Sequence, residues 1–464
     1  MKHYDLIVIG SGPAGERGAA QAAHIGKRVA LIERYPRIGG AGINTGTVPS
    51  KTLRESAMYY AGLRQRGLLG IDYSLKPNMA VANFMQREHI VIENEYRLAE
   101  QNIDRSNIAL IHGEASLKDA HTVRIETTSG DKEIHGDFIL IATGSSPIHP
   151  PGIPFDGNLI YDSESILRMD RIPRTMAVVG AGVVGTEYAS IFTALGVNVI
   201  LIEPKERLLP FVDTEMIHRL INQLKKSGIK FALGDQLQEI KHQGNRVHLR
   251  LSTLGVLDVD VVLITTGRQG NTQRLGLEQL GIELGEQEVI AVNGKYQTGV
   301  PNIYAAGDVI GFPALVSTSM EQARAAVMHA FNMENREEVS PVLPLAVYTI
   351  PEISSVGLTE DDCRAKGIPY LVGRAHYENT ARGQIIGDTS GMLKLVFSPE
   401  DKKLLGAHII GELASELVHI AMHVMLADGT LESFVRSVYN YPTLADLYKT
   451  AAYDGLKNLE EQRR

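Results

Sequence analysis

The chain of 464 residues has one cysteine and no long apolar stretch. Cys363 alone cannot form an internal disulfide or a thiolate metal site, and its charged neighbours predict an incidental thiol on an exposed helix. No segment approaches the roughly 20 apolar residues of a membrane span. The chain begins with a strand and a glycine-rich turn, not with a signal peptide. These absences favour a cytoplasmic protein with no metal centre and no membrane partner.

The charge of the chain lacks a basic excess, since 46 Lys and Arg stand against 54 Asp and Glu, for a net charge of −8. This balance argues against nucleic acid or an anionic membrane surface as a partner. The hydrophobic content of 44% is ordinary for a globular protein. The length predicts roughly three domains.

Residues 5–33 read as a buried strand, a glycine-rich turn, a helix and a second strand. Gly10 and Gly12 let the backbone turn tightly and approach a pyrophosphate, and Gly15 allows close packing of helix on strand. The N-terminus of the helix presents its N–H groups to that diphosphate. Glu33 ends the second strand, where its carboxylate can accept both hydrogen bonds of a ribose diol. The stretch therefore predicts an adenine dinucleotide site.

The same pattern returns with Gly180, Gly182 and Gly185. Glu203 follows Gly180 by 203 − 180 = 23 residues, and Glu33 follows Gly10 by 33 − 10 = 23 residues. Two such units predict two dinucleotides, and the natural pair is a flavin with a nicotinamide. Glu203 favours NAD(H) over NADP(H) because its charge repels a 2′-phosphate, although Lys205 and Arg207 are near enough in sequence to accommodate one.

The glycine-rich segment 38–51 ends in Pro-Ser-Lys and resembles the active-site stretch of the flavoprotein disulfide reductases, where a Cys-x4-Cys pair precedes these residues. Here Gly42 and Thr47 stand at the two cysteine positions. The family's C-terminal His-Pro-Thr-x-x-Glu is also changed, since it begins with Tyr441 and ends with Asp446. A phenol with a pKa near 10 is a poor thiol base at neutral pH. Both halves of the dithiol machinery are absent together, which indicates a different reaction.

The resemblance implies roles for individual residues. Lys51 would lie near flavin N5 and stabilise the negative charge of reduced flavin, although an isolated lysine here would more simply be solvated. Glu187 would lie beside the nicotinamide and pair with Lys51, although a glutamate in a first helical turn is usually a surface residue. Tyr441 of a partner subunit would cover the flavin, with Asp446 in place of the family's glutamate. Further cofactor contacts would come from Gly40, Ala115, Thr143, Gly144, Gly267, Gly307 and Asp308.

The predicted fold is α/β, with two nested Rossmann-like dinucleotide-binding domains and a C-terminal α+β dimerisation domain. We place the FAD-binding domain at 1–150 and 275–340, the NAD(P)-binding domain at 151–274 and the dimerisation domain at 341–464. Residues 52–105 are expected to be mostly helical. A homodimer or a larger homo-oligomer is expected from the resemblance.

Within the family, the chain is most similar to the soluble, Si-specific pyridine nucleotide transhydrogenases, which share Gly-Thr-[Ile/Val]-Pro-Ser-Lys and Asn-Tyr-Pro-Thr. One departure is Gly42, where that subgroup often keeps a cysteine. The resemblance implies ping-pong hydride transfer through FAD between NADPH/NADP+ and NADH/NAD+, without a redox disulfide. Two alternatives stay open: an NAD(P)H:quinone reductase or diaphorase, and a non-catalytic flavoprotein that senses NADH.

Overall fold

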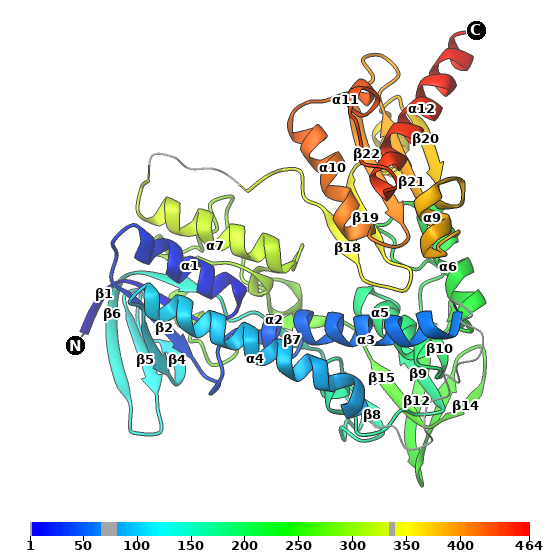
Figure 1. The fold of residues 1–464 in the computed structure, drawn as a ribbon. Coiled ribbons are helices and arrows are strands. Elements are labelled where there is room, and N and C mark those ends of the chain that lie inside the picture. The colour runs from blue at the N-terminus through cyan, green and yellow to red at the C-terminus, as the bar shows by residue number, and fades with distance from the viewer. Residues whose placement is uncertain (1, 66–80, 334–338) are drawn as a thin grey trace.

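The computed structural model describes residues 2–65, 81–333 and 339–464, and its three parts are each built on a sheet (Figure 1). We call these parts the first unit, the second unit and the C-terminal unit. Among the described helices, none has the length and apolar character to cross a membrane.

The first unit is a seven-stranded sheet in the order β3-β2-β1-β6-β5-β4, with β17 added beside β6. Strands β1, β2, β3, β6 and β17 are parallel, and β4, β5 and β6 form an antiparallel meander. The strands are β1 (Lys2–Ile9), β2 (Val29–Glu33), β3 (Ala109–His112), β4 (Glu114–Leu117), β5 (Thr122–Glu126), β6 (Lys132–Ile141) and β17 (Ile303–Ala305). Because β17 lies more than 150 residues after β6, the chain returns to this sheet after building the second unit.

Both faces of β1 are covered, which explains its continuous apolar sequence. Leu6 and Val8 pack with α1 (Pro13–His24) and α7 (Val316–Ala330), whose apolar side chains in this core are mostly alanine and therefore allow close approach. Ile7 and Ile9 point to the opposite face and pack against the meander.

The second unit repeats this design with a five-stranded sheet in the order β11-β10-β9-β15-β8. Helices α5 (Val183–Ala194) and α6 (Thr214–Ser227) pack on one face, and a three-stranded meander packs on the other. The strands are β8 (Ile160–Tyr161), β9 (Thr175–Val179), β10 (Asn198–Glu203), β11 (Lys230–Leu233), β15 (Val261–Ile264), and in the meander β12 (Leu237–Gln243), β13 (Arg246–Leu251) and β14 (Val256–Val259).

The C-terminal unit is a five-stranded antiparallel sheet in the order β18-β19-β22-β21-β20. Its strands are β18 (Leu345–Val347), β19 (Ile353–Gly357), β20 (Leu371–His376), β21 (Met392–Phe397) and β22 (Leu404–Ile410). Its helices are α8 (Glu360–Lys366), α9 (Ala381–Ile386), α10 (Ala414–Leu426), α11 (Leu431–Arg436) and α12 (Leu447–Arg463).

The predicted exposed thiol is wrong, because Cys363 in α8 is completely buried. The charged residues that surround it in the sequence lie in the first turn and on the outer face of this short helix, whereas Cys363 faces inward. Burial raises the pKa of the Cys363 thiol.

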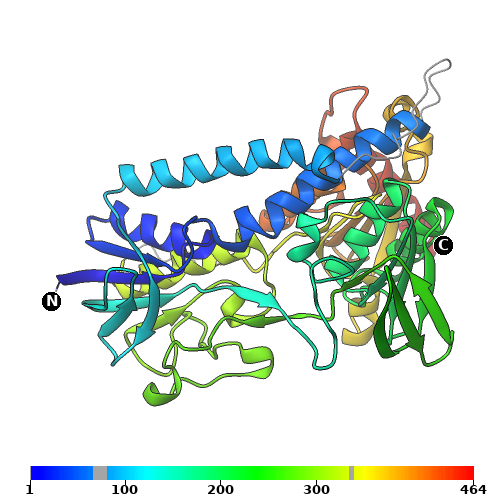
Figure 2. The same ribbon diagram turned by 90° about the horizontal axis from the view of Figure 1, so that it is seen from below.

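Two connections join the first and second units. Strands β7 (Ser145–Pro147) and β16 (Arg268–Gly270) form an antiparallel pair. Helices α3 (Thr47–Gln65) and α4 (Val81–Arg105) run between the units (Figure 2), and Leu53 and Ala57 of α3 belong to the core of the second unit. The helical prediction for 52–105 is therefore confirmed, except for residues 66–80, which lie outside the described part.

Short helices complete the described elements: α2 (Gly40–Asn44), η1 (Ser165–Arg168), η2 (Glu278–Leu280), η3 (Glu286–Glu288), η4 (Asp308–Ile310), η5 (Tyr377–Asn379) and η6 (Leu444–Asp446).

Candidate functional site

The first glycine-rich turn lies between β1 and α1, where β1 is flanked by β2 on one side and β6 on the other. Such a reversal of strand order is where open α/β sheets bind ligands. Gly10 has a φ of +100°, and a Cβ there would lie 2.4 Å from the Ala142 carbonyl oxygen. A Cβ on Gly15 would lie 1.8 Å from the Gly10 carbonyl oxygen. Only glycine fits both positions, so the turn is held tight against the end of β6.

The second turn has the same geometry between β9 and α5. Gly180 has a φ of +101°, and a Cβ there would lie 2.5 Å from the Thr265 carbonyl oxygen. A Cβ on Gly185 would lie 1.9 Å from the Gly180 carbonyl oxygen. Gly182 differs, because a Cβ there would meet nothing within 4 Å. The N-terminus of α5 is therefore open at Gly182.

The glutamates that end β2 and β10 make matching contacts. Glu33 Oε2 accepts the Ser11 N–H at 3.1 Å, and its Oε1 accepts the Tyr35 N–H at 2.9 Å. Glu203 Oε2 accepts the Ala181 N–H at 2.7 Å, and its Oε1 accepts the Lys205 N–H at 3.2 Å. Since a carboxylate can accept about four hydrogen bonds, Glu203 keeps acceptor capacity for a ribose diol, and Glu33, which also accepts from the Ser11 hydroxyl, keeps room for about one more bond.

The predicted flavin contacts converge on the start of α1. A Cβ on Gly40 would lie 2.8 Å from the Gly12 Cα, and a Cβ on Gly307 would lie 3.0 Å from the Ala14 Cβ. Two further predicted contacts follow β6. Gly144 has a φ of +69°, and the Thr143 hydroxyl oxygen is buried without a hydrogen-bond partner. This unpartnered oxygen and the cradle of glycines fit a bound dinucleotide with polar groups.

Asp308 begins η4, and Ala115 lies in β4. Asp308 Oδ2 accepts a hydrogen bond from the Ser145 hydroxyl at 2.9 Å. Ala115 is buried in β4, two residues after Gly113, whose N–H donates to the Glu33 carbonyl oxygen at 2.9 Å. Gly267, with a φ of +132°, follows β15 in the second unit. Their contacts with a cofactor stay predictions.

Lys51 and Glu187 meet across the boundary between the two units. Lys51 Nζ, on α3, lies 2.7 Å from Glu187 Oε2, on α5. Glu187 is only 5% exposed, so the carboxylate is held in the interior and pairs there with the lysine. The structure thus contains the pair that the family resemblance implied. The adjacent α2 packs on α1 without a thiol, and a Cβ on Gly42 would lie 2.8 Å from Pro13 Cγ.

Tyr348 contacts both members of this pair, and the sequence alone did not indicate a role for it. The Tyr348 N–H donates to Glu187 Oε1 at 2.8 Å, and its ring centroid lies 5.0 Å from Lys51 Nζ. Tyr348 belongs to the C-terminal unit, 161 residues after Glu187 in the chain. No local pattern links residues so far apart.

The predicted residues Tyr441 and Asp446 are not brought into this site within one chain. Tyr441 is 79% exposed, and Asp446 lies directly before α12. Their predicted action on a partner subunit stays a prediction.

The two cations near Glu203 are in different surroundings. Arg207 Nη2 lies 3.1 Å from Asp361 Oδ2 and 2.9 Å from the Thr214 hydroxyl oxygen, so its charge is already paired. Lys205 is exposed. Of the two, Lys205 is therefore the cation available to a 2′-phosphate.

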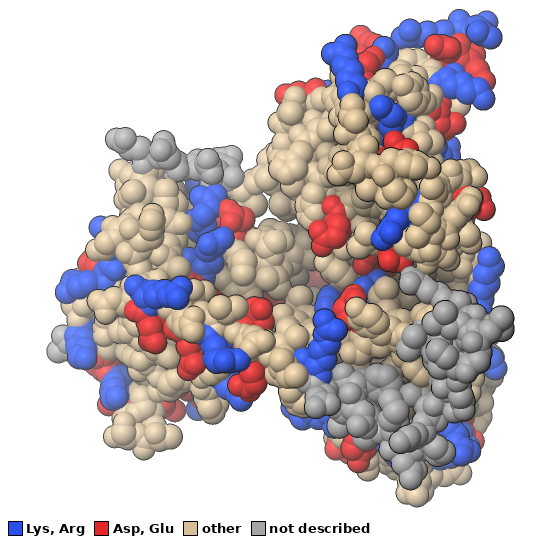
Figure 3. All heavy atoms as spheres, in the orientation of Figure 1, with Lys and Arg blue, Asp and Glu red and all other residues tan. Residues whose placement is uncertain are grey.

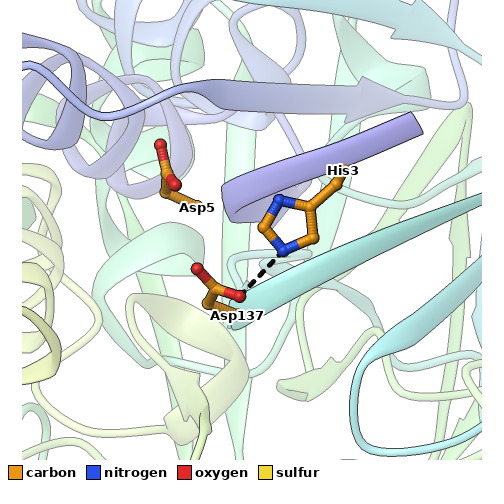
Figure 4. Close-up of side chains that lie close together, drawn as sticks. All are labelled: His3, Asp5 and Asp137. Carbon is orange, nitrogen blue, oxygen red and sulfur yellow. Dashed lines mark hydrogen bonds and ion pairs between the residues drawn. The ribbon is translucent and has the colours of Figure 1, made fainter.

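One group of possible metal ligands lies elsewhere in the described part of the chain. His3 and Asp5 of β1 and Asp137 of β6 have potential ligand atoms within 4.8 Å of one another. The His3 ring points toward Asp137, and its Nε2 lies 2.8 Å from Asp137 Oδ1 (Figure 4). Arg28 Nη2 lies 2.9 Å from His3 Nδ1 and 3.5 Å from Asp5 Oδ1. The guanidinium already occupies the place of a cation, so we interpret the group as an ion-pair cluster.

Acidic and basic side chains are interspersed on the face shown in Figure 3, with no continuous basic patch there.

Comparisons with known proteins agree over nearly the whole chain. Residues 4–330 match the family model described as pyridine nucleotide-disulphide oxidoreductase, and residues 343–452 match the dimerisation domain of that family. A soluble pyridine nucleotide transhydrogenase of Mycobacterium bovis is 42% identical over 461 residues, which cover 99% of this chain and 98% of the relative. A protein of the same name from a Marinomonas species is 40% identical and covers 99% of both chains.

Solved structures give the same result. LpdA from Mycobacterium tuberculosis has a TM-score of 0.90 at 26% identity, and the match covers 98% of this chain and 99% of LpdA. The HOCl-induced flavoprotein disulfide reductase RclA from Escherichia coli, as its Cu(II) complex, has a TM-score of 0.88 at 28% identity, with 98% and 99% covered.

Proposed function

Because the chain belongs to the pyridine nucleotide-disulphide oxidoreductase family, we propose that it is a FAD-dependent transhydrogenase that moves hydride between NADPH/NADP+ and NADH/NAD+. The names of its relatives support this activity. The observation that carries it is the Lys51–Glu187 pair beside a segment without cysteine at 42 and 47. We place the enzyme in the cytoplasm as a homodimer.

The first unit would hold FAD and the second unit would hold the nicotinamide nucleotides, one after the other. The turn from Gly10 to Gly15 and the N-terminus of α1 would receive the flavin diphosphate, and Glu33 would receive the adenosine ribose. The open turn at Gly182 and the N-terminus of α5 would receive the nicotinamide nucleotide. When bound, FAD supplies an acceptor for hydride from one nucleotide and a donor of hydride to the next.

Lys51 and Glu187 would orient the reacting groups. With FAD bound, the Lys51 ammonium would stabilise the negative charge that hydride acceptance adds. Glu187 Oε2 lies 2.7 Å from Lys51 Nζ, so the position of the ammonium is fixed before a nucleotide binds. Tyr441 of a second copy would exclude water from the face that a disulfide covers in the disulfide reductases.

The test is anaerobic stopped-flow absorbance of the purified, yellow protein. Mixing with NADPH should bleach the flavin, and a second mixing with an NAD+ analogue should restore the colour. Bleaching by NADH with reoxidation only by a quinone would instead establish a diaphorase. Absence of bleaching by either nucleotide would favour a protein that binds nucleotides without turnover.

A further inference from the structure

Tyr348 contacts both members of the Lys51–Glu187 pair. Its backbone N–H donates to Glu187 Oε1 at 2.8 Å, which leaves Oε2 to accept from Lys51. Its ring centroid lies 5.0 Å from Lys51 Nζ, within the range of a cation–π contact. One residue of the C-terminal unit therefore holds the carboxylate and the ammonium in their present positions.

The ring is itself held by a second cation. The Arg54 guanidinium carbon, one turn after Lys51 on α3, lies 5.9 Å from the ring centroid of Tyr348. Arg54 Nε donates to the Thr349 carbonyl oxygen at 3.1 Å, and Arg54 Nη2 lies 3.1 Å from Glu352 Oε2. The segment after β18 is thus bound to α3 at several points.

This second ion pair is buried and continues into the C-terminal unit. Arg54 and Glu352 are each 5% exposed. Glu352 Oε1 accepts from both the N–H and the hydroxyl of Ser415, at 3.1 Å each, in the first turn of α10. Breaking such a network leaves a buried charge unpaired, so the position of the Tyr348 ring is determined by the packing of three elements.

We propose that Tyr348 is a positioning residue, which holds the Lys51 ammonium on its ring face and the Glu187 carboxylate on its backbone N–H so that Lys51 faces the bound flavin. The inference rests on the proposed function, because it concerns the position of the Lys51 ammonium relative to the flavin during hydride transfer. The phenol acts as a neutral ring, since burial raises the pKa of Tyr348, an effect that the neighbouring Ser415 hydroxyl partly opposes.

The ring and the hydroxyl can be separated by two variants. Tyr348→Phe keeps the ring face, and Tyr348→Leu removes it while keeping a large apolar side chain and the backbone N–H. Each is made in the wild-type chain and in a Lys51→Met chain. Val347→Ala is the matched control, because Val347 is fully buried at the end of β18, directly before Tyr348, and its truncation loosens the packing there while Tyr348 stays unchanged.

The measurements are the rate constant of flavin bleaching by saturating NADPH, the NADPH concentration at half-maximal rate, and the flavin midpoint potential. We expect Tyr348→Leu to lower the rate constant by about 2- to 30-fold and to lower the midpoint potential, with little change in the half-saturating concentration. Tyr348→Phe should stay near the wild type. In the Lys51→Met chain, Tyr348→Leu should add no further loss.

Three results would overturn the inference: equal rates for Tyr348→Leu and wild type, an equal loss from Tyr348→Leu with and without Lys51, or the same loss from Val347→Ala. Each would assign Tyr348 to packing alone. A wild-type protein that neither NADPH nor NADH bleaches would instead contradict the proposed function.

Discussion

Glu33 and Glu203, which we predict to bind ribose, differ in that only Glu33 accepts a hydrogen bond from a side-chain hydroxyl. The Ser11 hydroxyl donates to Glu33 Oε2 at 2.5 Å, in addition to the two backbone N–H groups. The corresponding residue in the second turn is Ala181, which offers only its N–H. Glu33 is also only 5% exposed, whereas Glu203 is partly exposed. The first site is therefore more pre-organised, as expected for a resident cofactor, and the second is more open, as expected for substrates that exchange.

We predict that Glu203→Gln shifts the enzyme toward NADPH. The substitution removes the charge that repels a 2′-phosphate, so the ratio of kcat/KM for NADPH to that for NADH should rise on the order of tenfold. Lys205→Ala should lower the same ratio by about 3- to 10-fold. Steady-state kinetics with both nucleotides provide the measurement. Glu206→Gln, at an exposed neighbouring position, is the control, and an equal shift in that variant would argue for a general charge effect.

At the scale of elements, the second glycine turn combines two positions that have no room for a side chain with one that faces open space. Gly180 and Gly185 are required by the close approach of their own backbone and that of β15, whereas Gly182 faces open space. The first kind of glycine serves folding, and the second serves a ligand.

Alanine at these positions should separate the two roles. Gly182→Ala should fold, remain yellow and keep its melting temperature, but its KM for both nucleotides should rise on the order of tenfold because the new methyl group lies where the diphosphate approaches. Gly185→Ala should lower stability by roughly 3 kcal/mol or more, because its Cβ would collide with backbone. Thermal unfolding and steady-state kinetics test both. Normal KM values in Gly182→Ala would contradict our placement of the diphosphate.

At the scale of the whole molecule, a buried charge cluster joins the second unit to the C-terminal unit. Lys394 of β21 is fully buried, and its Nζ lies 2.6 Å from Asp213 and 2.7 Å from Glu360. Burial opposes ionisation of Asp213, but the neighbouring positive charges bring the pKa of this carboxyl below its ordinary value. His408 lies beside Lys394 on β22, and burial lowers the pKa of His408.

The cluster predicts a loss of stability in mild acid. An unfolded histidine has a pKa near 6.5, and His408 has a lower pKa when folded, so its contribution is complete above about pH 6.5 and is lost as the pH falls toward the folded value. The Asp213 contribution is lost only below about pH 4. His408→Gln keeps a donor for the Leu358 carbonyl without the titration, and its melting temperature should fall less between pH 7 and 5. His419→Gln, at an exposed position, should behave like the wild type.

The predicted role of Tyr441 depends on the homodimer. Tyr441 and Val438 are 79% and 93% exposed in the single chain, as expected for a surface that a second copy covers. If Tyr441 acts across the dimer, Lys51→Met and Tyr441→Ala subunits should complement each other, because one site of a hybrid dimer has both residues intact. Hybrids purified with two affinity tags should recover about half of the wild-type activity. Activity no higher than the mean of the parent dimers would contradict the action of Tyr441 across the dimer.

The sequence by itself determined the elements that depend on neighbours in the chain. Both glycine turns, the glutamates 23 residues after them and the buried strands could be recognised because periodicity and turn chemistry are local. The loss of cysteine at 42 and 47 was recognised by resemblance to the family. The tertiary structure alone decided contacts between distant segments: the Tyr348 N–H on Glu187, the pairing of Arg207 with Asp361, and the burial of Cys363. The Lys51–Glu187 pair was predicted by resemblance, not by spacing. Such contacts depend on how three sheets pack on one another, and no short-range pattern encodes that packing.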